Sequence, residues 1–381
     1  MSTVRLHAIF LAVGALMALP AAGAAAAPGQ RAAQLVELRP LAGDVTTFAT
    51  AVNDGGLVVG YSAVSGSLSP RRAVRWDNTG TPTDLGTLGG ALSTADAVND
   101  NGQITGFAEL ANGQVHAARW SADGRITDLG TLPGGTTSYG GDIAPDGTVV
   151  GTSDASDGLR HAVKWGPRGR ITDLGLPAGT EASWAGLVNA AGDVVGGAAT
   201  HLGVITSLRW NRDNVMVPLP GLDGSGAYAY DLAADGTAVG EADTSAAGYP
   251  VRWDRAGHLT QLSAQRGAAG AIGADGTIVG HVEDHAVKWD RQGRPITLGA
   301  LPDGAQSWAR DVNGRGVVVG NVMRSDIAAG RAVYWDRNGR IVELPTPDGA
   351  QDGGAEKINR SGLVIGGFSL VSGGHHAVLW K

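Results

Sequence analysis

Three aspartates recur at one position of a repeated segment, directly before an aliphatic residue: Asp142, Asp231 and Asp311. Two or three carboxylates about 5 to 9 Å apart can act as acid, base or nucleophile in glycoside hydrolysis. The competing interpretation is that they are salt-linked or solvated, and we favour it because every polar position recurs in several repeats. The motifs Gly-x-Ser-x-Gly and His-Glu-x-x-His and the phosphate-binding loop do not occur. No unique catalytic cluster follows from the sequence.

A second recurring position lies four residues before a tryptophan and carries histidine in half of the repeats: His116, His161, His285 and His376. Two ligands of one zinc ion lie within about 4 Å of each other. Neighbouring β-sheets, however, pack about 10 Å apart. We therefore expect hydrogen-bonded histidines at the sheet edges rather than a metal site. The chain contains no cysteine, which excludes disulfides and thiolate ligands, and we expect no cofactor.

A third recurring position is aromatic in five repeats and opens the first strand of each: Phe48, Tyr139, Trp184, Tyr228 and Trp308. Aromatic rings offer a large rigid contact area and, in Tyr and Trp, a polar group, which suits sugars and peptides. We predict that these five residues bind a ligand. Packing between neighbouring sheets is the competing interpretation.

A tryptophan marks each of eight repeats, which we number 1 to 8 in chain order: Trp76, Trp120, Trp165, Trp210, Trp253, Trp289, Trp335 and Trp380. Successive tryptophans are 36 to 46 residues apart, a period typical of repeat architectures. Upstream of each one stands a pair of glycines four residues apart, such as Gly102 and Gly106. Lys or Arg precedes the tryptophan in six repeats, and we expect these side chains to reach the rim of the sheet.

The apolar segments within each repeat are four to six residues long, rich in Val and Ile and bounded by Gly, Asn, Asp or Pro. This pattern predicts four antiparallel strands with tight turns. Such a sheet cannot be stable alone, so neighbouring repeats must stack on it. We predict an all-β fold, an eight-bladed β-propeller, with an open solenoid as the rival.

The ends of the chain favour the propeller. Repeat 8 stops at Trp380, after its third strand, whereas residues 34–38 have the pattern of a fourth strand with no repeat before them. We therefore predict that the N-terminal strand pairs with the C-terminal strand and closes the ring, because an open edge would invite aggregation.

The connections predict two different faces. Turns from the first to the second strand and from the third to the fourth share one face and are nearly uniform. We call the other end of the sheets the variable face, because there the distance from the second glycine to the tryptophan ranges from 9 to 16 residues. Such variation is what a scaffold leaves free for binding.

Residues 1–26 have the features of a secretory signal peptide: Arg5, an apolar run and a small-residue cleavage zone. We expect a short linker at 27–33 and a single propeller domain over 34–381. The mature protein is then extracellular. Its net charge of -7 argues against nucleic acid as a partner, and we expect no membrane insertion and a monomer.

The signatures Asp84-Leu85-Gly86-Thr87-Leu88, Val98-Asn99-Asp100 and His161-Ala162-Val163 resemble those of the HAF-repeat proteins, bacterial extracellular repeat proteins. The resemblance covers essentially all of residues 34 to 381. One departure is that the family's His-Ala-Phe reads His-Ala-Val or His-Ala-Ala here. The resemblance implies export and repetition, but no activity.

From these observations we predict a secreted, non-enzymatic module that binds a glycan, peptide or protein through its variable face. The alternative is a glycan-acting hydrolase or lyase that uses Asp142, Asp231 and Asp311, and a structural component of the cell envelope is a third interpretation. Ligand identity does not follow from the sequence.

Overall fold

The computed structural model describes residues 33–64, 70–302, 304–324, 329–371 and 373–381. The predicted signal peptide, 1–26, and all of the predicted linker except its last residue lie outside the described residues. Apart from one 3-10 turn, Leu222–Gly224, every regular element in these ranges is a β-strand. The predicted all-β fold of four-stranded antiparallel sheets is confirmed.

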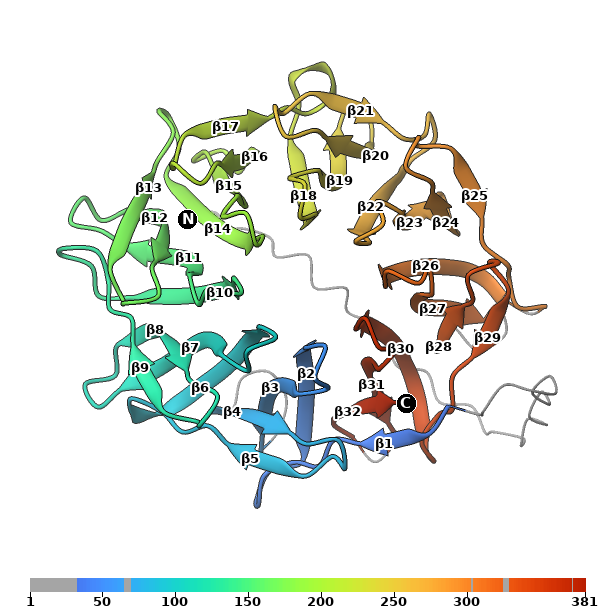
Figure 1. The fold of residues 1–381 in the computed structure, drawn as a ribbon, viewed down its shortest axis with the longest axis horizontal. Helices are drawn as coiled ribbons and strands as arrows, with labels where there is room; N and C mark the ends of the chain where they lie inside the picture. The colour runs from blue at the N-terminus through green and yellow to red at the C-terminus, as the bar shows by residue number, and fades with distance from the viewer. Residues whose placement is uncertain (1–32, 65–69, 303, 325–328, 372) are drawn as a thin grey trace.

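The first strand of each repeat lies at the inside of a ring of sheets (Figure 1). These inner strands are β2 (Thr46–Val52), β6 (Gly89–Val98), β10 (Ser138–Ile143), β14 (Ala182–Val188), β18 (Ala227–Leu232), β22 (Gly267–Ile272), β26 (Gly304–Val312) and β30 (Ala350–Ile358). The second strands are β3 (Val58–Ala63), β7 (Ile104–Leu110), β11 (Val149–Asp154), β15 (Val194–Ala199), β19 (Ala238–Asp243), β23 (Ile278–Val282), β27 (Val318–Arg324) and β31 (Val364–Leu370).

The third strands end on the recurring tryptophans: β4 (Arg71–Trp76), β8 (Val115–Trp120), β12 (Arg160–Trp165), β16 (Ile205–Trp210), β20 (Gly248–Trp253), β24 (His285–Trp289), β28 (Gly330–Trp335) and β32 (His375–Trp380). The outer strands are short: β5 (Pro82–Asp84), β9 (Ile126–Asp128), β13 (Ile171–Gly175), β17 (Met216–Leu219), β21 (Leu259–Gln261), β25 (Pro295–Thr297) and β29 (Ile341–Glu343). An eighth strand, β1 (Leu35–Glu37), lies at the corresponding place beside β32.

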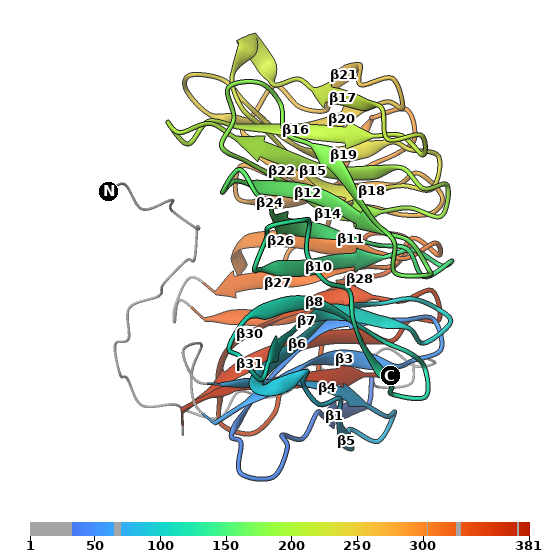
Figure 2. The ribbon, with the colours of Figure 1, turned by 90° about the vertical axis from the view of Figure 1, so that its left-hand side faces the viewer.

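Strands pair in chain order from the inside of the ring outward. Among the described residues they form six four-stranded sheets and one eight-stranded sheet, in which a single parallel bridge between Arg160 and Ala182 connects two four-stranded halves. In the sheet that contains the C-terminus, β1 pairs antiparallel with β32, and Leu35 lies opposite Trp380. Seen from the side, the sheets stack face to face along the ring (Figure 2).

The hydrophobic cores lie between sheets, and each takes residues from two neighbouring repeats. One core joins Leu85 of repeat 1 to Ile104 and Trp120 of repeat 2. The Nε1–H group of Trp120 donates to the carbonyl oxygen of Leu85 at 2.8 Å, so the buried indole is also hydrogen-bonded across the interface. All eight recurring tryptophans are buried. The tryptophans are therefore core residues, and they recur in the sequence because each repeat contributes one of them.

Turn chemistry between the third and fourth strands follows the sequence prediction. Gly124 adopts φ 86°, and Asn214, which replaces glycine in repeat 4, adopts φ 64°. Glycine and asparagine are the residues that tolerate this left-handed region.

A β-bulge interrupts the pairing of the first and second strands in every repeat, for example between Ala95 and Ala97. Beside the bulge, a β-carbon added to Gly106 would overlap the carbonyl oxygen of Thr94. The second glycine of the pair is thus required by the close approach of two strands. Such bulges locally disrupt the ladder and bend the bulged strand.

No helix in the described part of the chain is long and apolar enough to cross a membrane.

Candidate functional site

A layer of cross-strand pairs lies at the variable face, one pair in each repeat, where the inner strand begins opposite the second strand. We call these residues the mouth layer. In repeats 1 to 4 the pairs are Phe48 and Tyr61, Thr94 and Phe107, Tyr139 and Thr152, and Trp184 and Gly197. In repeats 5 to 8 they are Tyr228 and Glu241, Ala268 and His281, Trp308 and Asn321, and Gly354 and Gly367.

Seven residues of repeats 8, 1, 2 and 3 form a continuous series of ring contacts, which we call the aromatic–cationic belt: His375, Phe48, Tyr61, Arg71, Phe107, Tyr139 and Arg160. It begins where the ring of Phe48 stacks between His375, at a centroid distance of 4.1 Å, and Tyr61, at 4.8 Å. The Arg71 guanidinium then lies 5.2 Å from the Tyr61 ring and 5.9 Å from the Phe107 ring.

The belt continues into repeat 3. Phe107 and Tyr139 make an edge-to-face contact at 5.0 Å, and the Arg160 guanidinium lies 5.7 Å from the Tyr139 ring. Six of the seven side chains are half-buried, and Arg160 is exposed. The belt thus presents rings and guanidinium groups that are held in place by one another and are still reachable from solvent.

Burial changes the titration of two belt residues. It raises the pKa of Tyr61, against the opposing hydrogen bond and charge of Arg71. It lowers the pKa of His375, whose Nδ1 lies 2.9 Å from the carbonyl oxygen of Thr47. Tyr61 therefore remains a neutral donor at physiological pH, and His375 favours its neutral form.

The five aromatic residues predicted to bind a ligand all lie in the mouth layer, and all five are half-buried. Phe48 and Tyr139 belong to the belt. For Trp184, Tyr228 and Trp308, no ring–ring or cation–ring contact occurs among the described residues. The structure therefore places two of the five predicted residues in the belt and the other three outside it.

Five belt residues were not among the individual residues predicted to bind a ligand, although the first three lie at the ends of variable-face segments that the sequence marks as candidate binding loops: Tyr61, Arg71, Phe107, Arg160 and His375. Tyr61 and Phe107 each follow directly after the second glycine of the pair, on the strand beside the predicted aromatic position. The position after the second glycine could have been identified from the recurring glycine pair, but its residue type changes from repeat to repeat.

The three recurring aspartates each connect neighbouring repeats through one carboxylate oxygen and accept a local hydrogen bond with the other. Their Oδ2 atoms accept hydrogen bonds from main-chain N–H groups of the next repeat, at Val188, Ile272 and Ile358, over 2.8 to 2.9 Å. The Oδ1 atoms accept from the residue that follows each aspartate, over 2.8 Å: Asp142, Asp231 and Asp311 all do so. These contacts are those of a structural link.

One lysine interacts electrostatically with the recurring aspartates. Burial raises the pKa of Asp142, and it raises the pKa of Asp311 to about 6, although hydrogen bonds and Lys357 oppose the shift. Burial lowers the pKa of Lys357, but the negative charges of Asp311, Asp231, Glu356 and Asp142 outweigh that effect and raise it. Lys357 is thus a charged counterpart for the recurring aspartates.

Asparagines make the equivalent link in most other repeats. The Nδ2 groups of these residues donate to a main-chain carbonyl of the next repeat: Asn53, Asn99, Asn189, Asn313 and Asn359. Repeats 3 and 5 carry Ala144 and Ala233 at this position, and both of these repeats contain one of the aspartates. The aspartates therefore replace a missing asparagine link in repeats 3 and 5, and repeat 7 has both.

The predicted edge role of the recurring histidines is confirmed for His116 and His161. Their Nδ1 atoms lie 2.9 Å from Asp128 and Asp173 on the outer strand. Arg331 pairs with Glu343 at the same place in repeat 7. No group of three His, Cys, Asp or Glu side chains in the described ranges is arranged to hold a metal ion.

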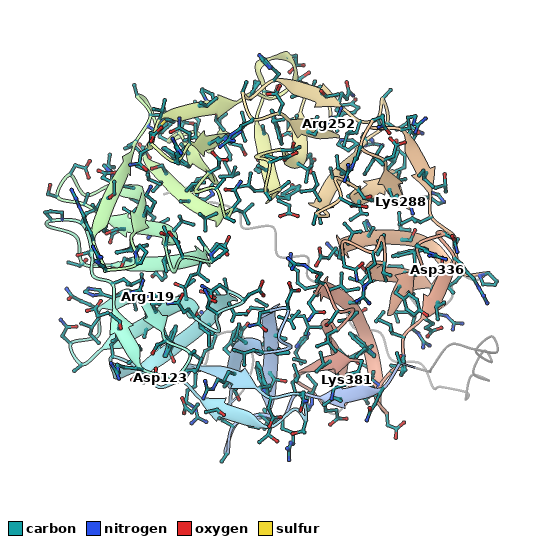
Figure 3. All side chains as sticks on the ribbon, in the orientation of Figure 1. Arg119, Asp123, Arg252, Lys288, Asp336 and Lys381 are labelled. Atoms are coloured by element: carbon teal, nitrogen blue, oxygen red, sulfur yellow. The ribbon has the colours of Figure 1, made fainter. Side chains whose placement is uncertain are left out.

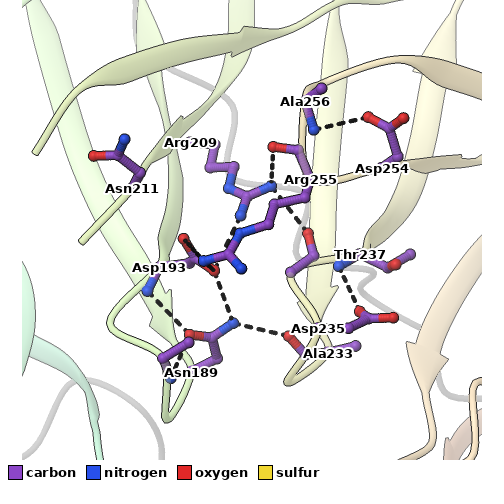
Figure 4. A network of polar contacts seen from close by, with 12 residues as sticks. Asn189, Asp193, Arg209, Asn211, Ala233, Asp235, Thr237, Asp254, Arg255 and Ala256 are labelled. Carbon is purple, nitrogen blue, oxygen red and sulfur yellow. Dashed lines mark hydrogen bonds and ion pairs between the residues drawn. The ribbon is translucent and has the colours of Figure 1, made fainter. Parts of the chain in front are cut away.

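The basic residues before the tryptophans donate to carbonyl groups of the next repeat; Figure 3 labels three of them. Arg119 donates to the carbonyl of Pro167 at 2.8 Å, Arg252 to that of Arg291 at 2.8 Å, and Lys288 to that of Arg337 at 3.0 Å. Asp193 of repeat 4 is fully buried, and Arg209 of the same repeat and Arg255 of repeat 5 lie 3.0 and 3.1 Å from its carboxylate (Figure 4). These cations connect neighbouring sheets.

A polar cavity of about 330 Å³ lies at the other end of the channel, between the uniform turns. Its lining includes Asn53, Asp100, Asn313 and Arg360. Asn53 and Asn313 are already engaged in the links between repeats, and Arg360 pairs with Asp54 at 3.2 Å.

Comparison with known proteins identifies the fold. No family model matches the chain, and no curated protein matches it. Among solved structures, the chain is similar to a puromycin hydrolase, with 15% identity and a TM-score of 0.53 over 85% of this chain and 58% of the other. It is also similar to a prolyl endopeptidase, with 10% identity and a TM-score of 0.55 over 86% and 55%.

A third similar structure is dipeptidyl peptidase 4 of Porphyromonas gingivalis, with 10% identity and a TM-score of 0.54 over 86% of this chain and 57% of the other. The chain spans less than three fifths of the length of each of these three proteins. At this identity the likeness establishes a β-propeller fold and no activity.

Proposed function

We propose that the protein is a binding module whose mouth layer holds an extracellular glycan or peptide against the aromatic–cationic belt. The observation that carries this proposal is the unbroken series of ring and guanidinium contacts from His375 to Arg160. A pre-ordered aromatic surface loses little conformational entropy when a ligand stacks on it. Residues that only filled a core would be buried, whereas these are partly open to solvent.

We further infer that the eight repeats are the eight blades of one propeller, closed by the pairing of β1 with β32. Two contacts support closure: Leu35 lies opposite Trp380, and Asn359 of repeat 8 donates to the carbonyl of Asn53 in repeat 1. Export by the predicted signal peptide, membership of the HAF-repeat family and a monomeric state are part of the same proposal and rest on the sequence.

The binding proposal is tested with glycan and peptide arrays and the purified protein. Replacing both Phe107 and Arg160 with Ala should weaken binding of any array ligand by at least about tenfold, because a stacking contact and a cation–ring contact are lost. Arg168→Ala is the matched control, since Arg168 is an exposed arginine of the same repeat in a turn of the uniform face. Equal affinity of the double variant and the control would contradict the proposal.

A hydrolase is the second candidate, and the comparisons favour it, because the similar structures reported above are a puromycin hydrolase and two peptidases. The carboxyl pKa of about 6 at Asp311 would suit an acid–base group. Turnover assays on every array ligand test this candidate. Loss of product formation in Asp311→Asn, with binding retained, would favour an enzyme over a binding module.

A further inference from the structure

Repeat 5 reverses the charge of the mouth layer. Repeats 1, 3 and 8 place Arg71, Arg160 and His375 at the start of the third strand, but repeat 5 has Gly248 there. A β-carbon at Gly248 would overlap Oε1 of Glu241, so the carboxylate occupies the space that a side chain would need. The glycine thus gives a negative group the place that an arginine occupies in repeats 1 and 3.

Glu241 is the centre of a small group of acidic and aromatic residues, which we call the repeat-5 cluster: Tyr228, Tyr230, Glu241 and Asp243. Tyr228 lies opposite Glu241 across the strand pair. The Tyr230 hydroxyl donates to Oε2 of Glu241 at 3.1 Å, while 44% of the residue remains exposed. Asp243 shares the side of Glu241 because residues two apart in a strand face the same way.

The two carboxylates have no cationic partner. Within the described ranges, no Lys, Arg or His lies at ion-pair distance from Glu241 or Asp243. Burial raises the pKa of both groups, and the charge of Asp243 raises that of Glu241 further, against the hydrogen bond from Tyr230. Half-buried carboxylates without a counter-charge are unfavourable for the folded chain, and a bound cation would relieve this.

The repeat-5 cluster and the belt lie on opposite sides of the same opening. Figure 1 shows β18 and β19 across the ring from β2 and β3, and the cross-strand positions that carry Tyr228 and Glu241 are those that carry Phe48 and Tyr61. The mouth layer therefore offers carboxylates with tyrosine faces on one side and rings with guanidinium groups on the other. Carboxylate and aromatic faces together are a surface that recognises ammonium groups.

Resting on the binding function proposed above, we propose that the ligand of the mouth layer is a peptide, and that the repeat-5 cluster binds a primary ammonium group of that peptide. The belt stacks the aromatic side chains of the same ligand. A neutral or acidic glycan brings no cation for Glu241 and Asp243, which is why the cluster favours the peptide.

The experiment compares two fluorescein-labelled octapeptides of alternating Phe and Lys, one with free lysines and one with every lysine Nε-acetylated. Both carry the label at the N-terminus, so they differ only in the side-chain ammonium groups. Fluorescence anisotropy with the full protein should show at least about tenfold tighter binding of the lysine peptide. Glu241→Gln with Asp243→Asn should abolish this preference.

Asp213→Asn is the matched control, because its side chain is 71% exposed in a turn of the uniform face and its loss changes the net charge in the same direction. The control should keep the preference, and melting temperatures should show that the double variant is folded. Equal binding of the two peptides, or a preference that survives the double variant, overturns the inference. A glycan whose binding depends on Phe107 and Arg160 but not on Glu241 would overturn it while supporting the binding function. Absence of any array ligand would contradict that function itself.

Discussion

Asp311 accepts hydrogen bonds from Val312 and from Ile358 of the next repeat, and burial raises the pKa of its carboxyl group from 3.8 to about 6. A carboxyl group with a higher pKa in the folded chain than in the unfolded chain binds its proton more tightly when folded. Its stabilising contribution is therefore complete below about pH 4 and is lost as the pH rises through 6.

The prediction at this scale concerns Asp311→Asn. The variant removes the ionisation, so the loss of unfolding free energy between pH 4 and pH 7 should be smaller than in the unmodified protein, by up to about 3 kcal/mol. Urea unfolding at the two pH values, followed by tryptophan fluorescence, measures this difference. Asp213→Asn is the control and should retain the original pH dependence. An identical dependence in Asp311→Asn would show that the carboxylate does not titrate in this range.

The sequence indicated the recurring aspartates but not their partners. Each accepts from a main-chain N–H group in the next repeat, and a main-chain donor has no signature in the sequence. The sequence shows that Ala144 and Ala233 stand where other repeats have asparagine. The effect of this difference can be understood only once Asn99 and Asn189 are known to connect repeats. Only two of the seven belt residues were predicted, for a similar reason, since Arg71 and Phe107 belong to different repeats and meet only in the folded ring.

The pairing of the first and second strands depends on the glycine beside each bulge. Gly106 has no room for a β-carbon, because the carbonyl of Thr94 occupies that space. Gly113, in a loop of the same repeat, has a φ of 82° and no atom within 4 Å of an added β-carbon. Gly106 is therefore required because there is no space for a side chain, whereas Gly113 is required only because of its left-handed backbone conformation.

We predict that Gly106→Ala destabilises the protein by at least about 3 kcal/mol, because two strands must move apart. Gly113→Ala should cost only about 1 to 2 kcal/mol, the strain of a left-handed backbone in a residue other than glycine. Thermal unfolding by circular dichroism compares the two variants. Similar losses in both would contradict the steric explanation.

Strands and turns could be predicted because each repeat gives independent evidence of the same pattern. The turn between the third and fourth strands could be predicted because glycine, or Asn214 in repeat 4, stands four residues after the tryptophan in repeats 1 to 7. The bulges could not be predicted, since they arise from the close approach of two strands around Gly106 and no residue type marks the extra position.

In the whole molecule, β1 is the only described strand that pairs with a partner from the far end of the chain. A variant that begins at residue 39 lacks this strand and leaves the outer edge of β32 unpaired. We expect its melting temperature to fall by at least about 10 °C and the variant to self-associate, because an exposed strand edge accepts strands from other chains.

A variant that begins at residue 33 retains β1 and is the control. Differential scanning calorimetry and light scattering measure both effects. A monomeric variant with an unchanged melting temperature would show that the pairing of Leu35 with Trp380 contributes little to stability. The sequence predicted this pairing from an unmatched strand at one end and a missing strand at the other.

The pairing of β1 with β32 also determines when the molecule can finish folding. During synthesis, Leu35 leaves the ribosome early, but its partner Trp380 follows only after the seven preceding repeats have been made. Individual sheets can form as their residues emerge, whereas the sheet that contains β1 and β32 must wait for β32. Contacts between such distant positions slow folding, so we expect this sheet to be the last to form and β1 to stay unpaired in a nascent chain that lacks repeat 8.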